Sequence, residues 1–204
     1  MSENFNLVIC GVGGQGVLTL SRILALAAMR MGYHVRIGET LGMSQRGGIV
    51  NSFLRFGADV YGPLVGEGDA DVIISLDYLE TLRVLNYASS SCGVVMNSNS
   101  IPPMSVLLGS EGMPSLSSVK AVVENYVKHV YLIDADGLAV KAGLSAAKNV
   151  VILGAFSRIF PRILNKDVIV SSIGEVVHGR YFDKNLLAFK LGYDSIASTE
   201  KFTF

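Results

Sequence analysis

Short apolar runs alternate along the chain with stretches in which apolar residues recur every three or four positions. The first run, Leu7–Cys10, is bounded by a glycine and is typical of a buried parallel strand. A helix is predicted directly after it, because the next apolar residues all fall on one helical face. These residues are Val17, Leu20, Leu24, Ala27 and Met31. Gly32 follows them, and a glycine there ends a helix at little conformational cost.

The same alternation continues to the end of the chain. Further strands are predicted at Tyr33–Ile37, Ile49–Phe56, Asp71–Leu76, Gly93–Asn97 and His129–Ile133. Further helices are predicted around Tyr78–Tyr87 and over Val119–Val127, Asn149–Phe160, Asp167–Val177 and Asn185–Leu191. Strands that alternate with helices at this spacing form a mainly parallel, doubly wound sheet. We therefore predict an α/β, Rossmann-like fold with a helical C-terminal part, in a single domain over residues 1–204.

The composition narrows the class of protein. Half of the 204 residues are apolar and only 17% are charged, which excludes a disordered chain. Because the net charge is zero and the pI is near 6.8, a protein that grips nucleic acid or an acidic membrane is not expected. No apolar run approaches the ~18 residues of a membrane span, and no cation precedes Arg22 as a signal peptide would require. We expect a cytoplasmic protein.

The sharpest local motif is the sequence GVGGQG. Gly11, Gly13 and Gly16 satisfy the pattern G-x-G-x-x-G directly between a predicted strand and a predicted helix. Gly13 and Gly14 let the backbone approach a ligand, and the amides that open the helix attract a phosphate or a carboxylate. Glu39 follows at the distance where dinucleotide-binding folds place a ribose-binding acid. The alternative is that these glycines only let the helix pack closely on the strand.

A second glycine-rich segment, residues 38–48, reads GETLGMSQRGG. It is too polar to lie in the core, and Arg46 at its tip could hold a carboxylate or phosphate beside Gln45. We expect this loop, with Gly47 and Gly48, to stand next to the first loop. One crevice would then be lined by Gly13, Gly14, Gln15, Gln45 and Arg46. A surface loop with a solvated arginine remains the alternative.

Other candidates for catalysis are weaker, and no catalytic residue is identified. The three histidines share no ligand spacing, and neither a metal site nor a Ser-His-Asp order is readable. Asp134 and Asp136 end the last predicted strand, where they could form a carboxylate pair, but Asp136 before Gly137 fits a helix cap equally well.

The motifs together resemble a known family. GVGGQGV, GMSQRGG, YGPLVGEGDADVI and NVVILGAF, in this order and over nearly the whole chain, look like the gamma subunit or domain of 2-oxoacid:ferredoxin oxidoreductases. The ending, with Asn185, Ala188, Phe189 and Gly192, is also similar. The QRGG form at 45–48 and the YGPLV segment most closely resemble the beta subunit of indolepyruvate ferredoxin oxidoreductase.

The resemblance implies oxidative decarboxylation of a 2-oxo acid, such as an aryl pyruvate, with coenzyme A to an acyl-CoA and carbon dioxide. Two electrons would pass to ferredoxin. The chain has two isolated cysteines and no GDG motif, so thiamine diphosphate and iron–sulfur clusters are expected on a larger partner subunit. The chain alone is expected to be inactive, and its glycine loop and Arg46 could receive coenzyme A. The alternative is a free-standing dinucleotide-binding oxidoreductase or nucleotide-binding module.

Overall fold

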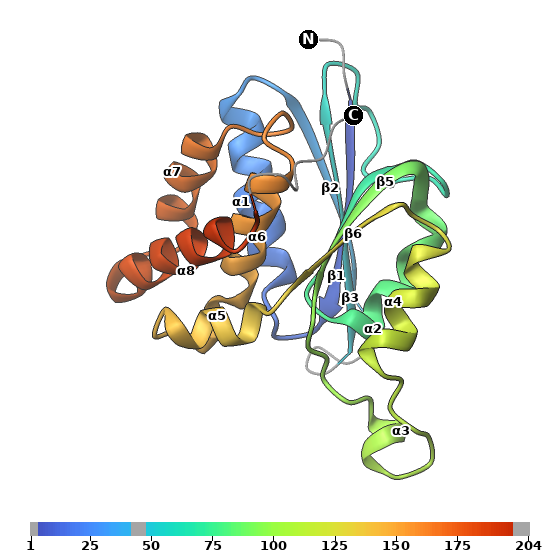
Figure 1. Ribbon diagram of the computed structural model, residues 1–204. Coiled ribbons are helices and arrows are strands. Elements are labelled where there is room, and N and C mark those ends of the chain that lie inside the picture. Colours follow the sequence, from blue (N-terminus) through green and yellow to red (C-terminus); the bar gives the residue numbers. More distant parts are fainter. Residues whose placement is uncertain (1–3, 42–47, 198–204) are drawn as a thin grey trace.

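A six-stranded sheet lies between two layers of helices in the computed structural model of the chain, which describes residues 4–41 and 48–197 (Figure 1). Its strands are β1 (Phe5–Val12), β2 (His34–Leu41), β3 (Ile49–Gly57), β4 (Ala70–Ser75), β5 (Ala88–Asn97) and β6 (His129–Ile133). Its helices are α1 (Val17–Arg30), α2 (Tyr78–Thr81), α3 (Met104–Leu107), α4 (Leu116–Glu124), α5 (Ala135–Lys141), α6 (Lys148–Ile159), α7 (Lys166–Val176) and α8 (Phe182–Asp194). Short 3-10 helices are η1 (Leu82–Tyr87), η2 (Ser145–Ala147) and η3 (Gly179–Tyr181).

The strand order is β2-β3-β1-β4-β5-β6. The four strands from β1 to β6 in this order run parallel, which confirms the predicted α/β class. β3 departs from the pattern, because it is antiparallel to both β1 and β2. The reason is the length of its link to β2, residues 42–48, since a parallel connection needs a crossover of about a dozen residues or more.

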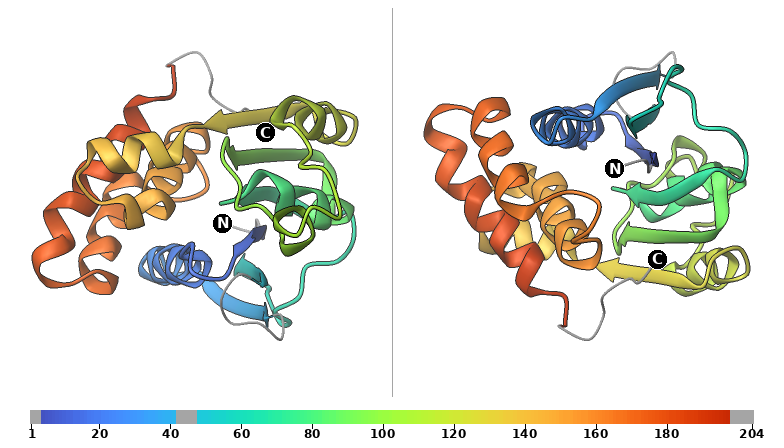
Figure 2. Two further views of the ribbon diagram at one scale, coloured as in Figure 1. Left: turned by 90° about the horizontal axis from the view of Figure 1, so that it is seen from below. Right: turned by 90° about the horizontal axis from the view of Figure 1, so that it is seen from above.

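The two faces of the sheet bury two separate apolar clusters. Leu7 and Ile9 of β1 point into the larger cluster with α1, α6 and parts of α7 and α8, whereas Val8 and Cys10 point into the smaller cluster with α2, η1 and α4. This is the alternation of side chains that a strand buried on both faces requires. Figure 2 shows the same division, with α1 and the C-terminal helices on one side of the sheet.

Helix α6 is the centre of the larger cluster, and α8 crosses it at unusually short range. An added Cβ at Gly192 of α8 would collide with the backbone carbonyl of Val151, and one at Gly154 of α6 would collide with that of Phe189. The two glycines therefore let the helices meet backbone to backbone. The NVVILGAF segment and the C-terminal motif of the sequence are the two halves of this crossing.

Several boundaries differ from the predictions. β2 continues to Leu41, so the first residues of the predicted second loop are strand. The helix predicted at Tyr78–Tyr87 is one α-helical turn followed by the 3-10 helix η1. The helix α5 was not predicted as a defined element, although it directly follows β6. None of the helices within the described ranges is long and apolar enough to cross a bilayer.

Candidate functional site

The first glycine-rich loop lies at the carboxyl edge of the parallel strands, at the bottom of Figure 1, beside the last residue of the second loop, Gly48. β1 ends at Val12, and residues 13–16 lead directly into α1. Ile49 of β3 pairs with Val12, and the Gly13 N–H donates to the carbonyl of Gly48 at 2.8 Å. Gly48, at the end of the second loop, therefore contacts the first loop. Ligands of doubly wound proteins bind at this edge.

The glycines of the first loop have different physical roles. Gly14 and Gly16 have φ angles of +98° and +90°, in the left-handed region that favours glycine. A Cβ at Gly14 would meet nothing within 4 Å, so this position is open, whereas one at Gly16 would lie 2.5 Å from Nδ2 of Asn149. A Cβ at Gly11 would lie 2.8 Å from Oε1 of Gln15. Gly11 and Gly16 thus serve close packing, and Gly14 leaves the loop surface free.

The start of α1 offers its backbone amides to this open surface. Gly16 is the N-cap residue and provides no side-chain hydrogen bond, and no acidic residue stands in the first turn. The N–H groups at the start of a helix carry partial positive charge and lack acceptors within the helix. An anion above Gly14 would find this polarity favourable.

The side chain of Gln15 does not line the crevice as the sequence led us to expect. It is only 4% exposed, and its Oε1 accepts from the Val12 N–H at 2.8 Å while its Nε2 donates to Asp77 at 3.3 Å. Gln15 therefore folds inward and fixes the shape of the loop. The ligand-facing part of the loop is its backbone at Gly13 and Gly14.

Asp77 is the residue of this site that sequence reasoning missed. It follows β4, is fully buried, and caps α2 by accepting from the Leu79 N–H at 3.0 Å. Its carboxylate also accepts from the Ser100 hydroxyl at 2.5 Å and from the Ile101 N–H at 2.8 Å. Together with Gln15, these contacts join the glycine loop, α2 and the segment before α3. An acid directly after the apolar run DVIISL was the available signal.

A second polar cluster stands at the ends of β5 and β6. Buried Asn97 donates to Asp136 at 2.8 Å and accepts from the Ala135 N–H, and Lys148 donates to the same Asp136 at 2.9 Å. Burial by itself raises the pKa of Asp136, but the hydrogen bonds from Asn97 and Lys148 and the lysine charge outweigh it, so the pKa lies below its usual range. The cap of α5 is Asp134, which accepts from the Gly137 N–H, and not Asp136.

The remaining predicted residues are placed as follows. Glu39 is exposed on the edge strand β2, paired with Ser52, and β3 separates it from β1. The ribose-binding position of a dinucleotide fold lies on a strand next to β1, so Glu39 does not have that geometry. Gln45, Arg46 and Gly47 lie outside the described residues.

Thiol and imidazole groups are not gathered at this edge. Cys10 and Cys92 are buried, and burial raises the pKa of each thiol to about 12. The three histidines are exposed and far apart in the sequence: His34 in β2, His129 in β6 and His178 just before η3. Within residues 4–41 and 48–197, no three His, Cys, Asp or Glu side chains are grouped as a metal site would need.

The fold and this edge define a class of protein, a Rossmann-like α/β chain whose glycine loop presents backbone N–H donors. The nearby carboxylates of Asp77 and Asp136 accept hydrogen bonds from the protein itself. The sequence matches the family described as pyruvate ferredoxin/flavodoxin oxidoreductase over residues 6–195. The chain belongs to this family.

Known proteins of similar sequence and fold bear this out. The chain is 43% identical to indolepyruvate oxidoreductase subunit IorB of Thermococcus kodakarensis over 191 residues, 93% of this chain and 95% of that one. The fold is similar to the gamma subunit of a keto/oxoacid ferredoxin oxidoreductase from Geobacter sulfurreducens, with TM-score 0.69 and 18% identity over 93% and 96% of the two chains. A 2-oxoglutarate:ferredoxin oxidoreductase from Magnetococcus marinus matches with TM-score 0.72 and 18% identity over 97% of this chain and 32% of that one. The resemblance to the gamma-type subunits is confirmed.

Proposed function

We propose that the chain is the subunit of a 2-oxo acid ferredoxin oxidoreductase, acting on indolepyruvate or another aryl pyruvate, that carries neither thiamine diphosphate nor iron–sulfur clusters. The complex would convert the 2-oxo acid and coenzyme A to acyl-CoA and carbon dioxide, with two electrons passing to ferredoxin. The observation that carries this proposal is the near full-length match to an indolepyruvate oxidoreductase subunit.

The residues of this chain do not fit the redox cofactors. A cluster needs several thiolates, and the chain has two cysteines, both buried with thiol pKa values of about 12. The only Asp-Gly step near the edge, Asp136–Gly137, lacks the preceding glycine, and Asp136 is held by Lys148. We therefore assign thiamine diphosphate and the clusters to a larger partner subunit, in a cytoplasmic complex with ferredoxin.

The role of this chain would be to receive coenzyme A at the carboxyl edge. The open backbone at Gly14 and the uncapped start of α1 suit a phosphate, and Arg46 of the adjoining loop would add a charge-assisted hydrogen bond. Gln15 and Asp77 would hold this surface in shape.

The test is the Arg46→Ala variant in the purified complex. A hydrogen bond between charged groups contributes about 1.5–3 kcal/mol, so the KM for coenzyme A should rise about ten- to hundredfold, with little change in the KM for the oxo acid. Arg162→Ala is the matched control, since this exposed arginine lies beyond the far end of α6. An unchanged KM for coenzyme A would leave the loop without this role.

The alternative of a free-standing dinucleotide-binding oxidoreductase is tested on the isolated chain. Calorimetric titration with NAD(H) and NADP(H) should give no appreciable heat, because Glu39 lies two strands away from β1. Tight binding of either nucleotide to the isolated chain would refute the subunit assignment. Purification of the tagged chain with a stoichiometric thiamine-binding subunit would support it.

A further inference from the structure

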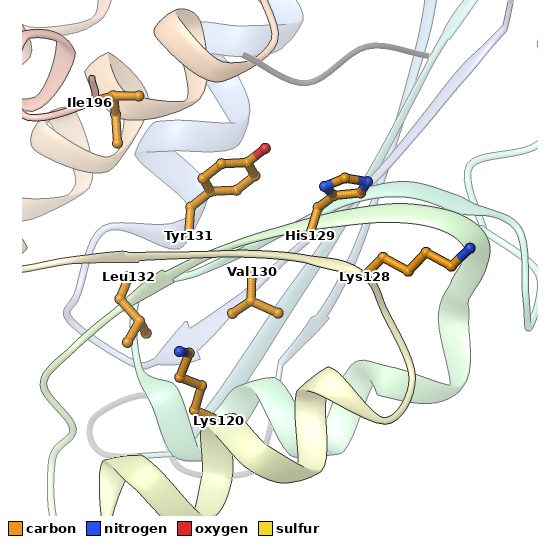
Figure 3. A pocket seen from close by; sticks show the side chains of 7 residues that line it. All are labelled: Lys120, Lys128, His129, Val130, Tyr131, Leu132 and Ile196. Atoms are coloured by element: carbon orange, nitrogen blue, oxygen red, sulfur yellow. The ribbon is translucent and has the colours of Figure 1, made fainter. Parts of the chain in front are cut away.

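The open edge of the sheet at β6 contains a groove of about 390 Å³ (Figure 3). The groove follows Lys128 and the first four residues of β6, His129 to Leu132. Val130 and Leu132 point to the side of Lys120 on α4, whereas His129 and Tyr131 point to the opposite side, where Ile196 lies. The groove is therefore a strand edge with a wall on each side, one from α4 and one from the segment after α8.

Some backbone N–H and C=O groups of β6 point into this groove and away from β5. β6 pairs with β5 alone in the described sheet, and the Ile133 carbonyl faces β5, since it accepts from the Ser98 N–H at 2.9 Å. In a strand, the N–H and C=O of one residue point to the same side and the side alternates from residue to residue. The backbone groups of Val130 and Leu132 therefore point outward, away from β5.

The charges around the groove favour an acidic occupant. Among the described residues, Lys120 and Lys128 line it and no carboxylate does. Lys120 is paired at the rim with Glu124, at 3.2 Å, whereas Lys128 is exposed and has no ion pair within the described residues. A second copy of this chain would bring the same lysines to the same edge, so charge complementarity disfavours a symmetric pairing.

We propose that the β6 edge docks an extended, acidic segment of the partner subunit, which adds a strand to the sheet. This proposal rests on the proposed function, which supplies the partner. Backbone hydrogen bonds to Val130 and Leu132 would give affinity, as in other cases of strand addition, and the lysines would select carboxylates.

The first test uses proline at a position where it spares the sheet. Val130→Pro removes the outward N–H but no hydrogen bond to β5, and Val130→Ala is the matched control that keeps the N–H. Circular dichroism checks that both variants fold. We expect Val130→Pro to weaken binding of the chain to the purified partner subunit at least tenfold, and Val130→Ala less than threefold. Equal binding of the two variants would overturn the proposal.

The second test concerns charge and uses exposed lysines elsewhere as controls. The double variant Lys120→Glu with Lys128→Glu should bind the partner at least tenfold more weakly at low salt than Lys141→Glu with Lys190→Glu. This difference should shrink as salt is raised, because exposed charges are screened. Equal loss of binding in both pairs would refute the acidic occupant.

Hydrogen exchange identifies which chain covers the edge. The amides of Val130 and Leu132 should exchange freely in the isolated chain and at least tenfold more slowly in the complex. Protection in the isolated chain that is lost in a variant ending at Ala197 would assign the edge to the chain's own residues 198–204 and overturn the proposal. Protection that rises with concentration would assign it to a second copy, with the same consequence.

The two proposals fail in different ways. A stoichiometric complex with the thiamine-binding subunit whose formation leaves the β6 amides unprotected refutes the docking site and leaves the proposed function intact. Failure of the unaltered chain to assemble with that subunit refutes the proposed function and removes the occupant of the groove.

Discussion

Replacement of Gly192 by alanine should destabilise the crossing of α6 and α8. The nearest obstacles to an added Cβ are backbone atoms of Val151, with the carbonyl carbon at 2.7 Å and Cα at 3.0 Å, whereas ordinary contacts begin near 3.4 Å. Backbone atoms inside a helix cannot rotate away, so the two helices must separate. Overpacking of a core costs about 1–3 kcal/mol, and we expect about 3 kcal/mol because neither side of this contact can yield.

The measurement is urea unfolding of the isolated chain followed by circular dichroism. At this chain length a loss of about 3 kcal/mol lowers Tm by about 6–12 °C, so a thermal scan gives a second readout. Gly154→Ala, which meets the Phe189 backbone from the other helix, should behave similarly. Gly112→Ala is the control, since nothing lies within 4 Å of its added Cβ, and its effect should stay within about 0.5 kcal/mol. Equal stability of Gly192→Ala and Gly112→Ala would refute the backbone contact.

Three further predictions concern the carboxyl edge and the thiols. The depressed pKa of Asp136 contributes stability that is present above the unfolded pKa near 3.8 and is lost as the pH falls through the lower folded pKa. Lys148→Met should weaken this dependence of the unfolding free energy on acid pH, measured by urea unfolding at several pH values. An unchanged pH profile would contradict the ion pair. Because burial raises the thiol pKa of Cys10 and Cys92 to about 12, neither should react with a thiol reagent at pH 8 until the chain unfolds, and rapid labelling of the native chain would refute their burial. Gln15→Met leaves the buried Val12 N–H without its acceptor, so it should cost about 1–3 kcal/mol in urea unfolding, and a neutral effect would show that the amide is dispensable.

The parallel part of the fold could be predicted because the spacing of apolar residues along the chain shows which faces of each strand and helix are buried. β6 was predicted with its observed ends, His129–Ile133, because the charged Lys128 and Asp134 flank it. α6 was predicted to within one residue at each end, because polar residues begin it and Pro161 follows it. The direction of β3 was not predicted, because the predicted second strand ended at Ile37 and left a link of residues 38–48. In the structure β2 continues to Leu41, and the remaining link is too short for a crossover.

The glycine loop lies between β1 and α1, where the sequence placed it, but the side-chain contacts around the loop were not predicted. The loop glycines were recognisable because a strand–glycine–helix pattern has a specific geometry. The orientation of Gln15 depends on Asp77, which is sixty-two positions away in the chain, and no local pattern reports such a contact. For the same reason the role of Asp134 as the cap of α5 could not be separated from that of Asp136 until Asn97 and Lys148 were placed beside them.

The position of α6 against the sheet has a consequence for how the protein is made. β1 is the first strand to be synthesised, yet the larger apolar face that contains Leu7 and Ile9 is completed by α6, which begins only at Lys148. A nascent chain that ends before Lys148 therefore carries this face uncovered. Such surfaces aggregate or bind chaperones during synthesis, so the C-terminal third of the chain acts as the closing step of folding.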